Sequence, residues 1–177
     1  MKTIEQIKKD FEIREPFVQD EENVLKCRQE FIQDNSYING GAGLTKISDY
    51  AEWLQRVEND KNGSNRPKRT ELLFIRKSDD RVVGFINIRH TLENGFDISG
   101  GHIGYSIRPS ERNKGYGTIL LSIAIDYCRK KLNMKKVLVT CDKSNIASKK
   151  VIINNNGKIE NEVAEGENII ERYWIKN

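Results

Sequence analysis

The sequence predicts a single α/β domain in which a mixed, mostly antiparallel sheet is flanked by helices. Two short runs of β-branched and aromatic residues, at 72–75 and 82–88, are separated by a polar turn, a pattern typical of a β-hairpin. Further along the chain, strand patterns alternate with helical patterns, as in α/β domains. A length of 177 residues with 37% hydrophobic content suffices for one core, so we expect residues 1–177 to form one domain.

The N-terminal part of the chain gives weaker patterns than the rest. The first 35 residues or so predict helix, with a strand over residues 11–17 as an addition near the start. Residues 36–45 form a glycine-rich loop, which either binds a ligand or is a flexible surface connection. A short helix is predicted over residues 48–57, and the polar residues 58–69 predict a mobile surface loop.

Three antiparallel strands are predicted before residue 108. The hairpin supplies two of them, and residues 101–107 supply the third. The next regular element is an amphipathic helix over residues 116–131, because apolar side chains recur there every three or four positions. This helix is expected to end near Asn133.

Beyond that helix, the pattern completes an α/β order. Residues 136–141 are almost continuously apolar, which indicates a strand covered on both faces, and a helical crossover places it parallel to the strand at 101–107. A second helix is predicted over residues 144–155, with Asn-Asn-Asn-Gly as its stop signal. Strands at 158–163 and 169–174 close the domain.

A small basic loop opens the helix at residue 116. Amides in the first turn of a helix lack intrahelical acceptors, and the helix dipole adds positive potential there, so such a junction binds anions. Gly115 and Gly117 allow a ligand to approach the backbone, while Arg112 and Lys114 add positive charge. The spacing fits neither the dinucleotide fingerprint nor the phosphate loop of nucleotide hydrolases, and a turn without a ligand is the alternative interpretation.

Charge and composition argue against several classes of function. The formal net charge is +4 with acidic and basic residues interleaved, so no nucleic-acid-binding face is indicated. The first ten residues lack the apolar core of a signal peptide, and no run approaches the ~18 apolar residues of a membrane span, which predicts a cytoplasmic protein without membrane association. Three cysteines and two histidines, far apart, predict neither a disulfide framework nor a metal site.

The basic loop and the strand before it resemble the acyl-CoA signature of the GCN5-related N-acetyltransferases, the GNAT family. That signature is Arg/Gln-x-x-Gly-x-Gly/Ala after a Val/Ile-x-Pro element. Here Ile107-Arg108-Pro109 is followed by Arg112-Asn113-Lys114-Gly115-Tyr116-Gly117. Asn113 stands where many members carry glycine, but asparagine tolerates unusual backbone angles, so we expect the loop to keep its form.

A second block supports the resemblance. Residues 137–148 and 151–157 are similar to the next strand and helix of the family, so that the resemblance covers residues 82–160, the cofactor half of the fold. The tail at 169–175 resembles the closing strand of a poorly characterised bacterial branch. Residues 1–70 carry no family motif and are expected to form the acceptor side.

The resemblance implies an acetyl-CoA site. In GNATs two parallel central strands splay apart, and the pantetheine arm enters between them and pairs with the strand before the loop, here at Ser106 and Ile107. The side chain of Arg112 would flank the diphosphate. The amides expected to bind this diphosphate are those of Asn113, Lys114, Gly115, Tyr116, Gly117 and Thr118. Asn145 and Ser148 would hold the pantetheine arm, although Asn145 also suits an ordinary helix cap.

The implied reaction is direct transfer of an acetyl group from acetyl-CoA to a primary amine. The amine must first lose a proton, because its pKa lies near 10.4. Many relatives protonate the departing thiolate with a tyrosine, but that position is Ile152 here. His90 and Tyr105 are therefore the candidate catalytic residues, with a structural role as the alternative for His90.

Two functions stay open at this point. One is the N-acetyltransferase, acting on a small-molecule amine or on a protein amine without a metal. The resemblance also suggests a homodimer, since dimers are common in the family. The other is an acyl-CoA-binding regulatory or partner module with weak catalysis, for which Ile152 is the motivation.

Overall fold

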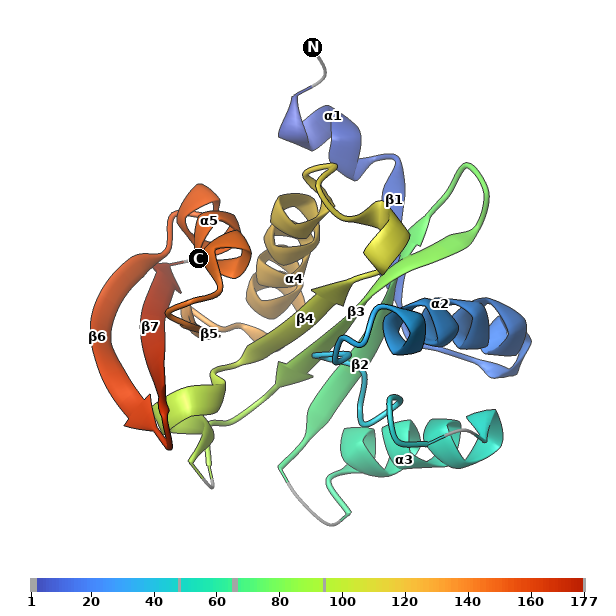
Figure 1. The fold of residues 1–177 in the computed structure, drawn as a ribbon, viewed down its shortest axis with the longest axis horizontal. Helices are drawn as coiled ribbons and strands as arrows, with labels where there is room; N and C mark the ends of the chain where they lie inside the picture. The colour runs from blue at the N-terminus through green and yellow to red at the C-terminus, as the bar shows by residue number, and fades with distance from the viewer. Residues whose placement is uncertain (1–2, 48, 65–66, 94, 177) are drawn as a thin grey trace.

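The computed structural model describes residues 3–47, 49–64, 67–93 and 95–176, and its strands form two antiparallel sheets (Figure 1). The first sheet has the order β1-β2-β3-β4, with β1 (Phe11–Arg14), β2 (Arg69–Arg76), β3 (Arg81–Arg89) and β4 (Ile103–Ile107). The second has the order β5-β7-β6, with β5 (Lys136–Asp142), β6 (Lys158–Glu165) and β7 (Asn168–Lys176).

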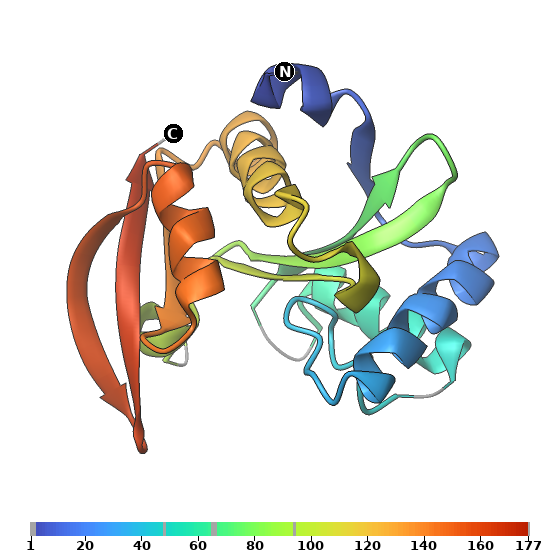
Figure 2. The same ribbon diagram turned by 45° about the horizontal axis from the view of Figure 1, so that its top comes forward.

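Helices cover both faces of the first sheet, and Figure 2 shows this sheet between α4 on one side and α2 with α3 on the other. The α-helices are α1 (Ile4–Lys8), α2 (Glu21–Gln33), α3 (Tyr50–Asn62), α4 (Tyr116–Leu132) and α5 (Ile146–Asn154). Short turns of helix lie at η1 (Val18–Asp20), η2 (Phe96–Gly100) and η3 (Pro109–Glu111). In the part of the chain that is described, none of these helices has the length and apolarity to cross a bilayer.

Two apolar clusters lie on opposite faces of the first sheet, and the alternation of side chains along β2 explains both. Leu72 and Phe74 point to the cluster that includes α4, β5 and β7, whereas Leu73 and Ile75 point to the cluster that includes α2 and α3. All four side chains are at most 3% exposed. An uninterrupted apolar run is thus the signature of this central strand.

The order of elements agrees with the predicted mixed α/β fold, and the predicted helix at 116–131 is α4. This helix ends at Leu132 and is capped by Asn133, whose φ of 53° places it in the left-handed region that asparagine tolerates. The Asn-Asn-Asn-Gly sequence was predicted to end the next helix, and this is confirmed, because α5 ends at Asn154 and Asn156 has a φ of 63°. The three strands predicted before residue 108 are β2, β3 and β4.

Two predictions for the N-terminal region are wrong in part. The first 35 residues are divided into α1, β1 and α2 instead of forming one helix, and β1, which pairs with β2, confirms residues 11–14 of the strand predicted over 11–17. The segment 58–69 was expected to be a loop, but α3 extends to Asn62 and Gly63 caps it at a φ of 70°. Val57 and Asp60 are buried in that last part of the helix, which anchors it. Residues 48, 65 and 66 of these predictions lie outside the described residues.

β4 and β5 are the splayed pair. They meet near the start of β4, where the His102 amide donates to the Leu138 carbonyl at 2.7 Å and Thr140 Oγ1 donates to the Ser99 carbonyl at 2.6 Å. Beyond this contact no ladder joins the two strands in the described chain, and the later residues of both line the same cavity. The strands therefore enclose a wedge that widens toward their carboxyl ends.

Candidate functional site

A cavity of about 930 Å³ occupies the wedge and extends to both faces of the first sheet. One end lies at the start of α4 and is lined by Asn113, Gly115, Tyr116, Gly117 and Thr118. The middle is lined by residues of β4, β5 and α5, among them Ile103, Tyr105, Ile107, Thr140, Cys141, Asp142, Asn145, Ser148, Lys150 and Val151. A further part of the lining, which we call the acceptor end, consists of Ser36, Tyr37, Asn39, Gly40, Arg89, Ser99, Gly100 and Gly104.

The start of α4 presents a row of free backbone donors. Asn113 and Gly115 have φ values of 62° and 79°, and these two left-handed residues turn the chain into the helix. The Thr118 amide donates to the Gly115 carbonyl, whereas the amides of residues 113–117 donate to no acceptor within the described chain. We call these five N–H groups the amide cradle. Such a row of donors, together with the helix dipole, suits an anion.

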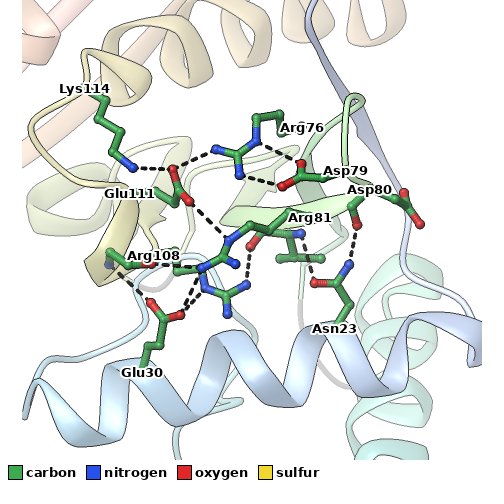
Figure 3. Close-up of polar contacts among 11 residues, drawn as sticks. Asn23, Glu30, Arg76, Asp79, Asp80, Arg81, Arg108, Glu111 and Lys114 are labelled. Carbon is green, nitrogen blue, oxygen red and sulfur yellow. Dashed lines mark hydrogen bonds and ion pairs between the residues drawn. The ribbon is translucent and has the colours of Figure 1, made fainter.

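A buried carboxylate, Glu111, connects the loop before α4 to the first sheet, and Figure 3 shows its contacts with Arg76, Arg81 and Lys114. Glu111, at 4% exposure, accepts hydrogen bonds from Arg76 Nη1 and Lys114 Nζ, both at 2.9 Å, and lies 3.2 Å from Arg81 Nε. Burial raises the pKa of Glu111, but the bonds from Lys114 and Arg76 outweigh burial and leave the pKa below its ordinary value. Lys114 thus points to Glu111, and it is not among the residues that line the cavity.

Two arginines fix the loop between β4 and α4 to the rest of the fold. Arg108, at 5% exposure, donates to Glu30 of α2 at 2.7 Å and to the Val82 carbonyl at 3.1 Å (Figure 3). Arg112 donates to Asp34 at 2.6 Å and to Ser36 Oγ at 2.9 Å. Arg112 lines the cavity, and its guanidinium also connects the amide cradle to the loop that enters the acceptor end.

Replacing Glu111 with glutamine is expected to lower the free energy of unfolding by about 2 kcal/mol, because a neutral amide cannot compensate three cations around a buried position. Chemical denaturation measures this loss. The matched control is Asp79→Asn, which removes another partner of Arg76 but at an exposed position, and should cost less than about 0.5 kcal/mol. Equal losses in both variants would contradict the supporting role of Glu111.

The hydrogen-bond pattern of β4 shows which of its backbone groups face the wedge. The Arg89 amide donates to His102, and the Arg108 amide donates to Val83, so the even-numbered residues of β4 exchange hydrogen bonds with β3. Ile103, Tyr105 and Ile107 therefore direct their N–H and C=O groups away from β3, toward the wedge. The backbone of Ser106 points to β3, and its Oγ is buried without a partner among the described residues.

Tyr105 and Ser148 meet in the middle of the cavity. Their hydroxyl oxygens lie 3.0 Å apart, and burial raises the pKa of Tyr105 to about 12, so the phenol stays protonated at neutral pH. Asn145 caps α5 by accepting a hydrogen bond from the Ser148 amide at 3.0 Å, and it lines the cavity as well. Cys141 is also a lining residue, and burial raises the pKa of its thiol to about 11.

The two histidines do not line the cavity. His90 Nε2 shares a hydrogen bond with Thr70 Oγ1 at 2.8 Å, and burial lowers its pKa. His102 Nδ1 accepts from the Leu138 amide at 2.9 Å, and burial lowers its pKa to about 4. Both rings are therefore neutral at pH 7. Ile152 is fully buried in the core between α5 and the sheet and offers no proton donor.

The acceptor end combines the glycine-rich loop, which the sequence offered as a possible binding loop, with Arg89, which the sequence analysis did not single out. The glycine-rich loop lies directly on β4, since a Cβ added at Gly40 would be 2.4 Å from the Gly104 carbonyl oxygen. Arg89, the last residue of β3, is the charged residue of this end. The sequence contained one signal for this residue. Arg89 follows a buried apolar run and stands two positions after Asn87, so the two polar side chains lie on the same face of β3.

Comparison with protein-family models places a domain over most of the chain: the model described as an acetyltransferase (GNAT) domain matches residues 11–157. A comparison with curated proteins finds none that matches. The fold can therefore be compared with known proteins chiefly through solved structures.

Several solved structures share the fold across almost the whole chain. A ribosomal-protein-S5-alanine acetyltransferase from Vibrio fischeri has a TM-score of 0.69 at 16% identity, with 95% of this chain and 93% of that chain covered. The microcin C7 self-immunity acetyltransferase MccE, in complex with acetyl-CoA and AMP, has a TM-score of 0.72 at 13% identity, with 95% and 93% covered. A spermidine N-acetyltransferase from Vibrio cholerae, in complex with CoA and spermine, has a TM-score of 0.66 at 13% identity, with 95% and 96% covered.

Proposed function

This chain belongs to the GNAT acetyltransferase family, a family of acyltransferases, and from that premise we propose that it transfers the acetyl group of acetyl-CoA to a primary amine by direct attack. The observation that carries the proposal is the continuous cavity between the amide cradle and the acceptor end. An anion site, an open strand edge and a second opening for another substrate lie along one path. The MccE structure, which holds acetyl-CoA, supports this choice of acetyl donor.

The residues present fit acetyl-CoA along this path. The amides of residues 113–117 suit the diphosphate, with Arg112 beside them. The backbone groups of Ile103, Tyr105 and Ile107 at the open edge of β4 suit an extended arm with amide groups, as an additional strand would pair there. Lys150 lines the cavity at α5, whereas Lys149 is held by Glu171 at 2.7 Å.

The chemistry requires little of the protein beyond positioning. The unprotonated amine attacks the thioester carbonyl, a C–N bond forms, the C–S bond breaks, and the amine loses its second proton to water. A backbone N–H at the open edge of β4 stabilises the negative charge that develops on the carbonyl oxygen. The thiolate receives a proton from Tyr105 O–H, which Ser148 orients and which regains its proton from solvent.

Thiol release tests the proposal. Mixing the protein with acetyl-CoA and a panel of primary amines should release free thiol only when an amine is present, and mass spectrometry should show one added acetyl group on the amine. Calorimetry with acetyl-CoA alone reports on the site itself. Failure of acetyl-CoA to bind would refute the proposed site, and binding without release under any condition would refute the transfer.

The Tyr105→Phe variant is expected to reduce kcat by about 30-fold while the KM for acetyl-CoA changes little, because the phenyl ring keeps its packing and only the proton donor is lost. Steady-state thiol release measures both constants. Tyr127→Phe, on the side of α4 that packs against the core, is the control for loss of a hydroxyl and should retain full kcat. A thioester with a more acidic leaving thiol should lessen the Tyr105→Phe defect, and an undiminished defect would contradict the role of the phenol as donor.

One observation favours a second candidate function. Ile152 occupies the position at which many relatives carry a tyrosine, and it is sealed in the core. A chain with an intact amide cradle but no efficient proton donor would serve as an acyl-CoA-binding regulatory or partner module. Tight acetyl-CoA binding without thiol release across the amine panel is the result that would select this alternative.

Location in the cytoplasm and homodimer formation remain predictions.

A further inference from the structure

Arg89 places a fixed positive charge in the acceptor end of the cavity. Its Nη1 donates to the carbonyls of Gly100 and Gly101 at 3.1 and 2.9 Å, and its guanidinium lies over the Phe96 ring at 4.4 Å. These contacts hold the side chain in one position. Nη2 makes no hydrogen bond within the described chain and lies 3.8 Å from the position of a Cβ added at Gly104. Arg89 Nη2 can thus donate a hydrogen bond to a ligand in the cavity.

This charge lies beside the place where the acetyl group is transferred. Gly104 directly precedes Tyr105, whose N–H and C=O face the wedge. The side of β4 above Gly104 is the side that the loop at Gly40 covers, opposite to the Tyr105 side chain. An amine that reaches the wedge through the acceptor end therefore passes close to the Arg89 guanidinium.

No carboxylate forms an ion pair with this cation in the described chain, where its hydrogen bonds go to backbone carbonyls. Among the described residues that line the acceptor end, Arg89 is the one with a charged side chain. Glu71 is the acidic group that interacts with Arg89, and burial raises the pKa of Glu71 to about 8, so it is mostly protonated at pH 7. Burial and the nearby charge of Arg69 lower the pKa of Arg89 to about 10, which still leaves it charged.

We propose that the acceptor is a primary amine that carries an anionic oxygen group, a carboxylate or a phosphate, a few bonds from its nitrogen, and that Arg89 binds this group. The inference rests on the proposed acetyl transfer and names the substrate class for it. A charge-assisted hydrogen bond to Arg89 Nη2 would hold the anion near Gly104 and present the amine to the open edge of β4. Arg89 is in this sense a specificity-determining residue.

The same charge disfavours polycations. A polyamine such as spermidine brings additional ammonium groups into an end of the cavity that lacks a carboxylate to receive them, and each would be repelled by Arg89. The solved Vibrio cholerae enzyme is named for spermidine, yet at 13% identity the likeness concerns the fold. The name of that enzyme therefore does not identify the amine substrate of this chain.

Matched pairs of amines test the inference. Glycine and glycinamide differ in a carboxylate, O-phosphoethanolamine and ethanolamine differ in a phosphate, and spermidine represents the polycations. The quantity compared is kcat/KM for each amine, expressed per concentration of unprotonated amine, since the members of a pair differ in their amine pKa. Wild-type protein should prefer the anionic member of at least one pair by about 30-fold, and the pair concerned identifies carboxylate or phosphate as the bound group.

Variants assign the preference to Arg89. Arg89→Gln should bring the ratio within each pair to near 1, and Arg89→Lys should keep part of the preference, because the charge remains without the planar fork. Arg69→Gln is the matched control, since Arg69 also packs on Phe96, at 4.9 Å, but does not line the cavity; it should keep most of the preference. Acetyl-CoA affinity, measured by calorimetry, confirms that each variant retains the donor site.

The outcomes separate this inference from the proposed function. Thiol release that favours neutral amines or spermidine, or a preference that survives in Arg89→Gln, would overturn the inference and leave the transferase intact. Acetyl-CoA binding without release for every amine would overturn the transfer and the inference together.

Discussion

The Gly115→Val variant is expected to bind acetyl-CoA at least about 100-fold more weakly than the wild type, a loss of roughly 3 kcal/mol. Gly115 begins α4 at a φ of 79°, and a Cβ added there meets no atom within 4 Å, so a valine side chain would extend into open space beside the amide cradle. It would obstruct the diphosphate and disfavour the left-handed turn that orients the N–H groups. Calorimetry with acetyl-CoA measures the change.

A matched substitution separates obstruction from backbone strain. Gly166, in the turn between β6 and β7, also has a positive φ, 60°, and an added Cβ there also meets nothing within 4 Å, but it lies outside the cavity lining. Gly166→Val should lower the melting temperature by a similar amount and leave acetyl-CoA affinity unchanged. Gly117 is less suited to this test, because a Cβ there would be 3.0 Å from Val151 Cγ2 and would disturb the packing of α5. Undiminished affinity in Gly115→Val would refute the placement of the diphosphate.

The Glu71→Gln variant is expected to be more stable than the wild type above neutral pH, by on the order of 4 kcal/mol near pH 8. Glu71 lies in β2 at 4% exposure; Asn87 donates a hydrogen bond to its Oε1, and its Oε2 has no partner within the described chain. Burial raises the pKa of Glu71 from 4.5 to about 8. Glutamine keeps the acceptor for Asn87 and cannot ionise.

The sign of the pH dependence follows from the raised pKa. Below about pH 4.5 the carboxyl group is protonated in both folded and unfolded chains, and above that value the unfolded chain releases the proton while the folded chain retains it until pH 8. The wild type therefore loses about 1.4 kcal/mol of stability per pH unit in this window, with a smaller slope near pH 8, and Glu71→Gln should not. Urea denaturation between pH 7 and 8.5 avoids the titration of His90 and His102, whose lowered pKa values act in the opposite direction at lower pH.

The exposed Glu167→Gln, in the turn between β6 and β7, is the control for loss of a carboxylate. It should follow the pH dependence of the wild type. Parallel stability curves for Glu71→Gln and the wild type would show that the Glu71 carboxyl group is ionised in the folded state at neutral pH, which would also weaken the case that Arg89 is uncompensated.

The amide cradle could be predicted from the sequence because its determinants are local. Asn113, Gly115 and the helical pattern that follows lie within a few residues of one another, and each acts through backbone conformation. The wedge was predictable only through the resemblance to a family. A pattern of strands indicates that β4 and β5 are neighbours, but not that their ladder fails beyond the contact of His102 with Leu138.

The acceptor end could not be predicted because its residues are far apart in the chain. Gly40 contacts Gly104, and Arg89 is held by carbonyls of the segment at 100–101, contacts that depend on tertiary packing. Composition placed the glycine-rich loop equally well at a binding site or at the surface. For the same reason Glu111 gave no signal, since its three cationic partners come from β2, β3 and the loop before α4.

Main-chain N–H groups make up the amide cradle, so mutational drift of most side chains leaves its donors in place. Their orientation depends on the two left-handed residues, Asn113 and Gly115, and on the buried Glu111, whose ion pairs hold the loop before α4. The acceptor end depends instead on side chains such as Arg89, so a single substitution there can change its charge while the amide donors stay in place.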